Sequence, residues 1–129
     1  MEEFHTPSHY PANWHVRFLC DCKKQGQPIR IHEGFAHDIS SETMCIRSDH
    51  HICSGKEVAV LLKIPPLVQG QEQSLVKLVG KSVLTVAHAG DFLTEIKFTR
   101  FENDGYEKLN GHLARRLGNQ LYSKNHDAA

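Results

Sequence analysis

Residues 36–66 constrain the fold most strongly, because they contain three short strand-like runs separated by polar turns and end in two prolines. In the last run Val58, Val60 and Leu62 share one face of a strand, and their neighbours are also largely apolar. Proline ends such a strand because it has no backbone N–H to donate. This pattern predicts a small β-barrel that carries a polar turn.

Alternation of apolar and polar side chains extends to both sides of this stretch. In residues 14–22, Trp14, Val16 and Phe18 alternate with mostly polar neighbours, which predicts a half-buried first strand. Further strand-like runs occupy residues 29–35, 75–87 and 92–101. The connections are too short for parallel crossovers, so we expect the strands to be antiparallel.

From Asp104 onward the apolar period changes from two to about four. Leucines recur at positions 109, 113, 117 and 121, which is typical of one face of an amphipathic helix. We therefore predict a mostly β domain, a six-stranded antiparallel β-barrel with a C-terminal α-helix. It should occupy residues 14–122, between a flexible N-terminal segment (1–13) and a frayed tail (123–129).

The charge balance argues against several classes of partner. Fifteen basic and fifteen acidic residues cancel, so no overall field attracts DNA, RNA or an anionic membrane. The acidic N-terminus lacks the features of a secretory signal, and no apolar run reaches the length of about 18 residues that spans a bilayer. We expect a cytoplasmic protein without membrane insertion.

The polar element Asp38-Ile39-Ser40 is the candidate ligand-facing turn. Strand geometry would place Ile39 in the core and direct the carboxylate and the hydroxyl outward together. Both groups accept hydrogen bonds, so they could bind a ligand. The alternative is that they bond to the backbone at the end of their own strand, as Asp and Ser side chains often do.

The order of these elements resembles the PilZ family over roughly residues 9–117. The resemblance implies a six-stranded β-barrel, and many PilZ domains are receptors for the bacterial second messenger cyclic di-GMP. The family binds through Arg-x-x-x-Arg before the first strand and a later (Asp/Asn)-x-Ser-x-x-Gly. Asp38 and Ser40 match the second motif, but Thr43 stands in place of its glycine.

The arginine motif is absent from this chain. At the corresponding spacing, the sequence HTPSH places His5 and His9 where the arginines would be. Histidine is mostly neutral at neutral pH, whereas arginine is always charged and offers a planar fork of donors. The candidate ligand-binding residues are therefore Asp38, Ser40, His5 and His9, with Arg47 as a further cation beside His50 and His51.

Four cysteines allow a different interpretation. Cys20, Cys22, Cys45 and Cys53, with nearby histidines, could form a zinc or thiol site if the strands brought them together. The sequence has no Cys-x-x-Cys knuckle, and buried cysteines commonly act as small apolar side chains. We assign no metal, no cofactor and no catalytic residue, and we expect the chain not to be an enzyme, because no catalytic motif occurs.

The favoured hypothesis from the resemblance is a PilZ-type receptor or adaptor that binds cyclic di-GMP, including as a weak-binding variant, and reports to a downstream protein partner. The alternative is a PilZ-like adaptor that does not bind the messenger. Such an adaptor would act through protein contacts, for example in type IV pilus biogenesis or motility.

Overall fold

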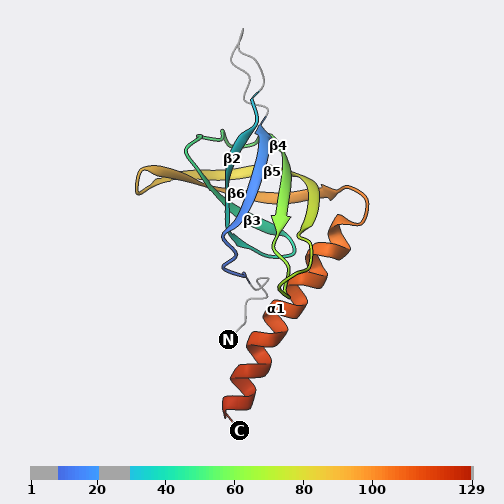
Figure 1. Ribbon diagram of the computed structural model, residues 1–129. Coiled ribbons are helices and arrows are strands. Elements are labelled where there is room, and N and C mark those ends of the chain that lie inside the picture. Colours follow the sequence, from blue (N-terminus) through green and yellow to red (C-terminus); the bar gives the residue numbers. More distant parts are fainter. Residues whose placement is uncertain (1–8, 21–29, 129) are drawn as a thin grey trace.

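The computed structural model describes residues 9–20 and 30–128, with side chains described as far as Leu117. Six strands close into a barrel in the order β1-β2-β3-β6-β5-β4, and every neighbouring pair is antiparallel (Figure 1). The elements are β1 (Trp14–Cys20), β2 (His32–Ile39), β3 (Thr43–Ser48), β4 (Glu57–Ile64), β5 (Ser74–His88), β6 (Asp91–Phe101) and α1 (Gly105–Ala128). The expected mostly β class, with six antiparallel strands and a C-terminal helix, is confirmed.

Alternating side chains of the strands fill the barrel. Trp14, Val16 and Phe18 are buried from β1, as the period-2 pattern predicted. In β4, whose sequence is apolar on both faces, the buried side chains are Val58, Val60, Leu62 and Ile64. The other buried apolar side chains come mainly from β2, β3, β5, β6 and the start of α1: Ala36, Ile39, Met44, Ile46, Ile52, Val76, Leu78, Ile96, Leu109 and Leu113.

The face of β2 that is buried is the opposite of the one that its large apolar residues suggest. Ile31 and Phe35 are 65% and 43% exposed, whereas Gly34 and Ala36 point into the barrel. At Gly34 the chain of β3 passes very close, because a Cβ there would lie 2.5 Å from the carbonyl oxygen of Arg47. A small residue is therefore needed on the inner face, and the larger side chains turn outward.

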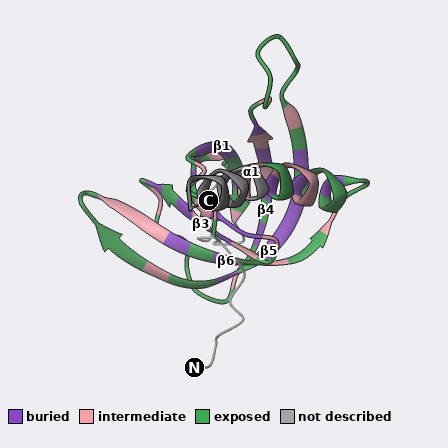
Figure 2. Cartoon of the chain, turned by 90° about the horizontal axis from the view of Figure 1, so that it is seen from below, coloured by how far each residue is buried: buried purple, intermediate pink, exposed green. Residues whose placement is uncertain are grey.

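Strands β5 and β6 form a hairpin whose tip extends beyond the barrel wall (Figure 1, gold). Its turn, Ala89-Gly90, has positive φ at both residues (50° and 89°), which matches the right-handed twist of the strands. The pairing of β5 with β4 ends at Lys81, and Ser82 still exchanges backbone hydrogen bonds with Gly55 and Lys56. Beyond Ser82, β6 is the described strand that pairs with β5. Figure 2 shows that much of this projecting part is exposed or half-buried.

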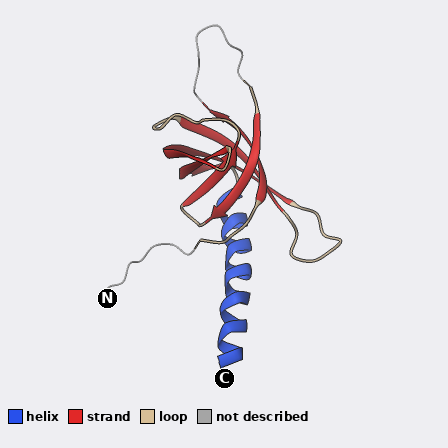
Figure 3. Cartoon of the chain, turned by 90° about the vertical axis from the view of Figure 1, so that its left-hand side faces the viewer, coloured by secondary structure: helices blue, strands red, loops and turns tan. Residues whose placement is uncertain are grey.

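Helix α1 attaches to one end of the barrel. Leu109 and Leu113 are buried, and Arg116 places its guanidinium 5.0 Å from the centre of the Trp14 ring and donates to the carbonyl of Pro65 (2.6 Å). The helix then continues away from the barrel to Ala128 (Figure 3). The segment 123–128, expected as a frayed tail, is thus helical, since neither glycine nor proline interrupts it. Within the described part of the chain, no helix is long and apolar enough to span a membrane.

Candidate functional site

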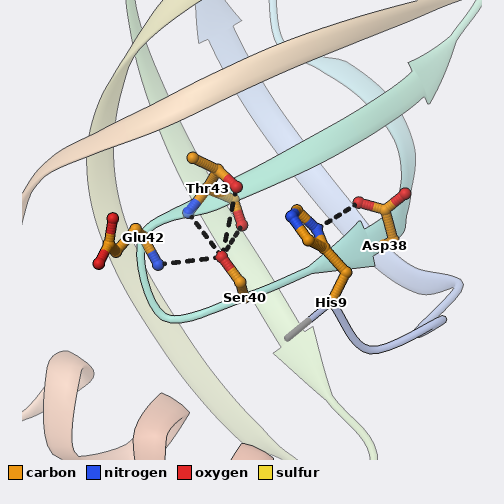
Figure 4. A network of polar contacts seen from close by, with 5 residues as sticks. All are labelled: His9, Asp38, Ser40, Glu42 and Thr43. Atoms are coloured by element: carbon orange, nitrogen blue, oxygen red, sulfur yellow. Dashed lines mark hydrogen bonds and ion pairs between the residues drawn. The ribbon is translucent and has the colours of Figure 1, made fainter. Parts of the chain in front are cut away.

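The end of β2 and the segment before β1 lie side by side. Tyr10 donates to the carbonyl of Ile39 (2.7 Å), and Ile39 donates in return to Tyr10 (3.0 Å). This pairing places Nδ1 of His9 3.1 Å from Oδ1 of Asp38 (Figure 4). The structure therefore brings together two of the four residues selected from the two PilZ motifs, and it orders part of the segment 1–13 that was expected to be flexible. His5 lies outside the described residues.

Ser40 is fully buried, so the expectation that its hydroxyl faces outward is wrong. Its Oγ accepts the amide hydrogens of Glu42 (3.2 Å) and Thr43 (3.1 Å) and lies 3.3 Å from the carbonyl oxygen of Thr43, to which it donates (Figure 4). The alternation of inward and outward side chains along β2 ends at Ser40, because the chain reverses direction there. The backbone N–H of Ser40 donates to the carbonyl of Thr43 (2.8 Å) and closes the turn. Ser40 thus adopts the backbone-bonding role that was the alternative interpretation.

Thr43 replaces the motif glycine without backbone strain. Its φ angle is not positive, unlike those of Asn13, Ala89 and Asn103, and it begins β3 opposite Lys97. Glycine is needed where φ is positive or where another backbone approaches closely. This turn is instead closed by the bonds between Thr43 and Ser40, so it does not require the conformational freedom of glycine.

Negative charge surrounds the hollow beside this turn. The hollow is lined by His9, Asp38, Thr43, Met44, Cys45 and Glu95. Cys45 pairs with Asp38 on one side and with Glu95 on the other. Burial, together with these two carboxylates, raises the pKa of the Cys45 thiol to about 11. The same field disfavours an anionic ligand.

Arg47 does not supply a cation to this hollow. It does not line it, and its Nε lies 3.8 Å from Oδ2 of Asp91 near the hairpin turn. His50 adds little positive charge nearby, because burial and the adjacent His32 lower its pKa. The ring of His51 packs edge-on against Phe92 (5.2 Å between centres). The grouping of Arg47 with His50 and His51 therefore does not form a cationic pocket around Asp38.

Replacing Ser40 by alanine tests whether this serine holds the turn. The change removes the hydroxyl that pairs with the part-buried backbone amides of Glu42 and Thr43, so we expect the free energy of unfolding to fall by about 1–3 kcal/mol. The matched change Ser41→Ala should cost less than about 0.5 kcal/mol. Urea denaturation of both variants measures the difference, and equal effects would contradict a structural role for Ser40.

A second cluster of reactive side chains lies at the other end of β1. Atoms of Cys20, His32 and His50 that can bind metal all lie within 4.8 Å of one another. The sequence pointed to Cys20 and His50 but not to His32. His32 could have been identified as a member of this cluster only from the register of β1 and β2. That register pairs His32 with Phe18, and Phe18 lies two residues before Cys20. Among the described residues, neither Cys45 nor Cys53 belongs to such a group, and Cys22 lies outside the described residues.

Comparison with known proteins supports the fold and leaves the family open. No family model matches the sequence, and no curated protein matches it. The solved structure of the Bacillus subtilis inhibitor of motility (MotI/DgrA) superposes with a TM-score of 0.70 at 10% identity, covering 92% of this chain and 53% of that one. The chain thus spans about half the length of this similar structure. At so low an identity the likeness concerns the fold alone, and that fold is a PilZ-like β-barrel with a C-terminal helix.

Proposed function

We propose that this chain is a non-enzymatic PilZ-like adaptor of bacterial signalling that acts through protein contacts and does not depend on tight binding of cyclic di-GMP. The observation that carries the proposal is the state of the candidate nucleotide site. The buried hydroxyl of Ser40 forms hydrogen bonds within its own turn, and Asp38 and Glu95 line the adjoining hollow.

The charges around the candidate site are unfavourable for binding cyclic di-GMP. Cyclic di-GMP carries two phosphodiester charges, which arginine would meet with charge-assisted hydrogen bonds worth roughly 1.5–3 kcal/mol each. Histidines at positions 5 and 9 replace both arginines, so the loss is on the order of a hundredfold or more in affinity. The carboxylates of Asp38 and Glu95 add repulsion that an anion must overcome.

The projecting hairpin offers a surface suited to a protein partner. Val83, Leu84 and Val86 are all about half exposed, with Leu84 at 56%. Beyond Ser82, β5 pairs with no described strand on the side away from β6, so an extended segment of a partner could add a strand there, near the hairpin tip. Apolar side chains beside an open edge favour association with protein rather than with a nucleotide.

The similar structure suggests the process to examine first. MotI/DgrA is described as an inhibitor of motility. A motility component is therefore the first class of partner that we would test for this chain, which we propose to be cytoplasmic. The adaptor role does not depend on this choice, because it rests on the hairpin and on the acidic hollow.

Weak, dissociable binding of cyclic di-GMP is the second candidate function. The observation in its favour is the contact between His9 and Asp38, which joins the segment before β1 to the end of β2 as a two-motif site would require. A receptor of this kind would use His5 and His9 as replacements for arginines. It would bind better at lower pH, where histidine becomes charged.

Site-specific photo-cross-linking in the native cells tests the adaptor proposal. A photoreactive phenylalanine analogue is placed at Leu84 on the hairpin or at Val68, an equally exposed apolar residue in the β4–β5 connection. We expect one discrete cross-linked protein from position 84 and none from position 68, and a Val86→Lys change should abolish the product. Equal products from both positions, or none from either, would contradict the use of the hairpin.

A further inference from the structure

Cys20, His32 and His50 converge at the end of the barrel that lies away from α1. The helix packs beside Trp14 at the start of β1, whereas Cys20 is the last residue of that strand. His32 begins β2, and His50 lies two residues after the end of β3. Three separate parts of the chain thus meet at one place, and all three side chains are half-buried.

The distances between these side chains suit a metal ion. Sγ of Cys20 lies 3.1 Å from Nε2 of His50, and the ligand atoms of all three residues are within 4.8 Å of one another. Zinc bonds of 2.3 Å to sulfur and 2.0–2.1 Å to nitrogen, at tetrahedral angles, imply ligand separations of about 3.3–3.6 Å. Ligand atoms that are now up to 4.8 Å apart would therefore have to approach one another by on the order of 1 Å to reach these separations.

The two imidazole rings are the groups that must move. They are stacked with centres 3.7 Å apart and planes 14° apart, and Phe18 continues the stack on His32 (5.4 Å). Nε2 of His50 already lies 3.1 Å from Sγ of Cys20, so a rotation of the His32 ring about its side-chain bonds would be needed to direct one of its nitrogens toward the same point. Such a rotation requires no movement of the strands.

The backbone at His50 is already held in place. Oγ of Ser48 accepts the amide hydrogen of His50 (3.2 Å) and donates to its carbonyl (3.1 Å). Further along the same connection, Thr85 donates to the carbonyl of Ile52 (2.6 Å). The connection is thus tied to the barrel on both sides of His51. A site whose ligand positions are fixed before binding loses less conformational entropy when the ion arrives.

We propose that Cys20, His32 and His50 bind a zinc ion. One thiolate and two imidazoles are a ligand set that zinc favours, and three protein ligands leave the fourth tetrahedral position to solvent or a further ligand. Binding converts the Cys20 thiol to a thiolate and releases its proton to the buffer. The ion would join the ends of β1 and β2 to the β3–β4 connection. This proposal departs from the expectation that the chain carries no metal.

Zinc titration of the full-length chain, prepared without a histidine tag and under reducing conditions, tests this proposal. Wild-type protein should bind one zinc ion in competition with a chromophoric chelator. The variants Cys20→Ser, His32→Gln and His50→Gln should each bind at least about 100-fold more weakly. Matched controls that leave the cluster intact, Cys45→Ser on the outer face and His37→Gln at an exposed position, should bind as wild type does.

Two further readouts separate metal binding from a folding defect. Zinc at about 100 times its Kd should raise the Tm of wild type by about 5–10 °C and should not raise that of the cluster variants. Cobalt in place of zinc should give a thiolate-to-cobalt charge-transfer band that Cys20→Ser removes and Cys45→Ser retains. Circular dichroism without metal confirms that each variant is folded.

Two outcomes would overturn the proposal. Wild type that binds no zinc at micromolar concentrations would show that Phe18, His32 and His50 form only a ring stack at the barrel end. Zinc binding that the Cys45→Ser control weakens as much as Cys20→Ser does would place the ion elsewhere. Neither outcome affects the adaptor proposal, which rests on other residues.

Discussion

Replacing Leu109 by alanine is expected to lower the free energy of unfolding by about 2–5 kcal/mol, because the change leaves a cavity where α1 meets the barrel. Leu109 is fully buried one turn after the helix begins. At the start of this turn the helix lies against β5, where a Cβ on Gly105 would be 3.1 Å from the side chain of Val76. The loss should therefore loosen the helix as well as the core.

Leu84→Ala is the matched control, since it removes the same atoms from an exposed site. With Leu84 at 56% exposure, we expect a loss of less than about 0.5 kcal/mol. Urea denaturation, followed by circular dichroism, measures both variants. A loss at Leu84 as large as at Leu109 would mean that the hairpin belongs to the core and is not available to a partner.

Gly80→Ala is expected to lower the free energy of unfolding by about 1–3 kcal/mol through overpacking. A Cβ at this position would overlap Cγ2 of Ile96 and lie 2.8 Å from the carbonyl oxygen of Lys97 on β6. The backbone of β6 cannot withdraw easily, because β3 pairs with it on the other side. The register between β5 and β6 also shifts at this point, so the strands depend on a close approach here.

Gly111→Ala should have the opposite effect. Gly111 lies inside α1, and apart from the adjacent backbone of the helix no described atom lies within 4 Å of the added methyl group. Alanine favours a helix interior over glycine by about 1 kcal/mol. Thermal and urea unfolding of the two variants compare the same chemical change at a crowded and an open position. Stabilisation by Gly80→Ala would contradict the packing of β5 on β6.

The strands were predictable where alternation is long and regular. In β1, apolar side chains at every second position identified the inward face, whereas β4 is apolar on both faces and its sequence predicted a strand without indicating which face is buried. Strand β2 was harder, because Phe35 faces outward and the inner face consists of small residues. Small residues such as Gly34 do not produce an apolar pattern that identifies a buried face. They are required here because the backbone of β3 passes close to β2.

The candidate site was only partly predictable for a similar reason. The resemblance assigned His9 and Asp38 to one candidate site, and the structure places their side chains 3.1 Å apart. The burial of the Ser40 side chain was not predictable, because it depends on where β2 ends and the chain reverses direction. The cluster of Cys20, His32 and His50 depends on the register of two strands and on the path of a connection, neither of which local patterns define.

Isothermal titration of the purified chain with cyclic di-GMP tests the central claim most directly. The titration is run at pH 7.5 and at pH 6, beside an Asp38→Ala variant. The account predicts no saturable binding up to about 100 μM ligand at pH 7.5, because arginines are missing and Asp38 and Glu95 repel the dianion. Micromolar binding by wild type that Asp38→Ala abolishes would contradict the account and establish the chain as a messenger receptor.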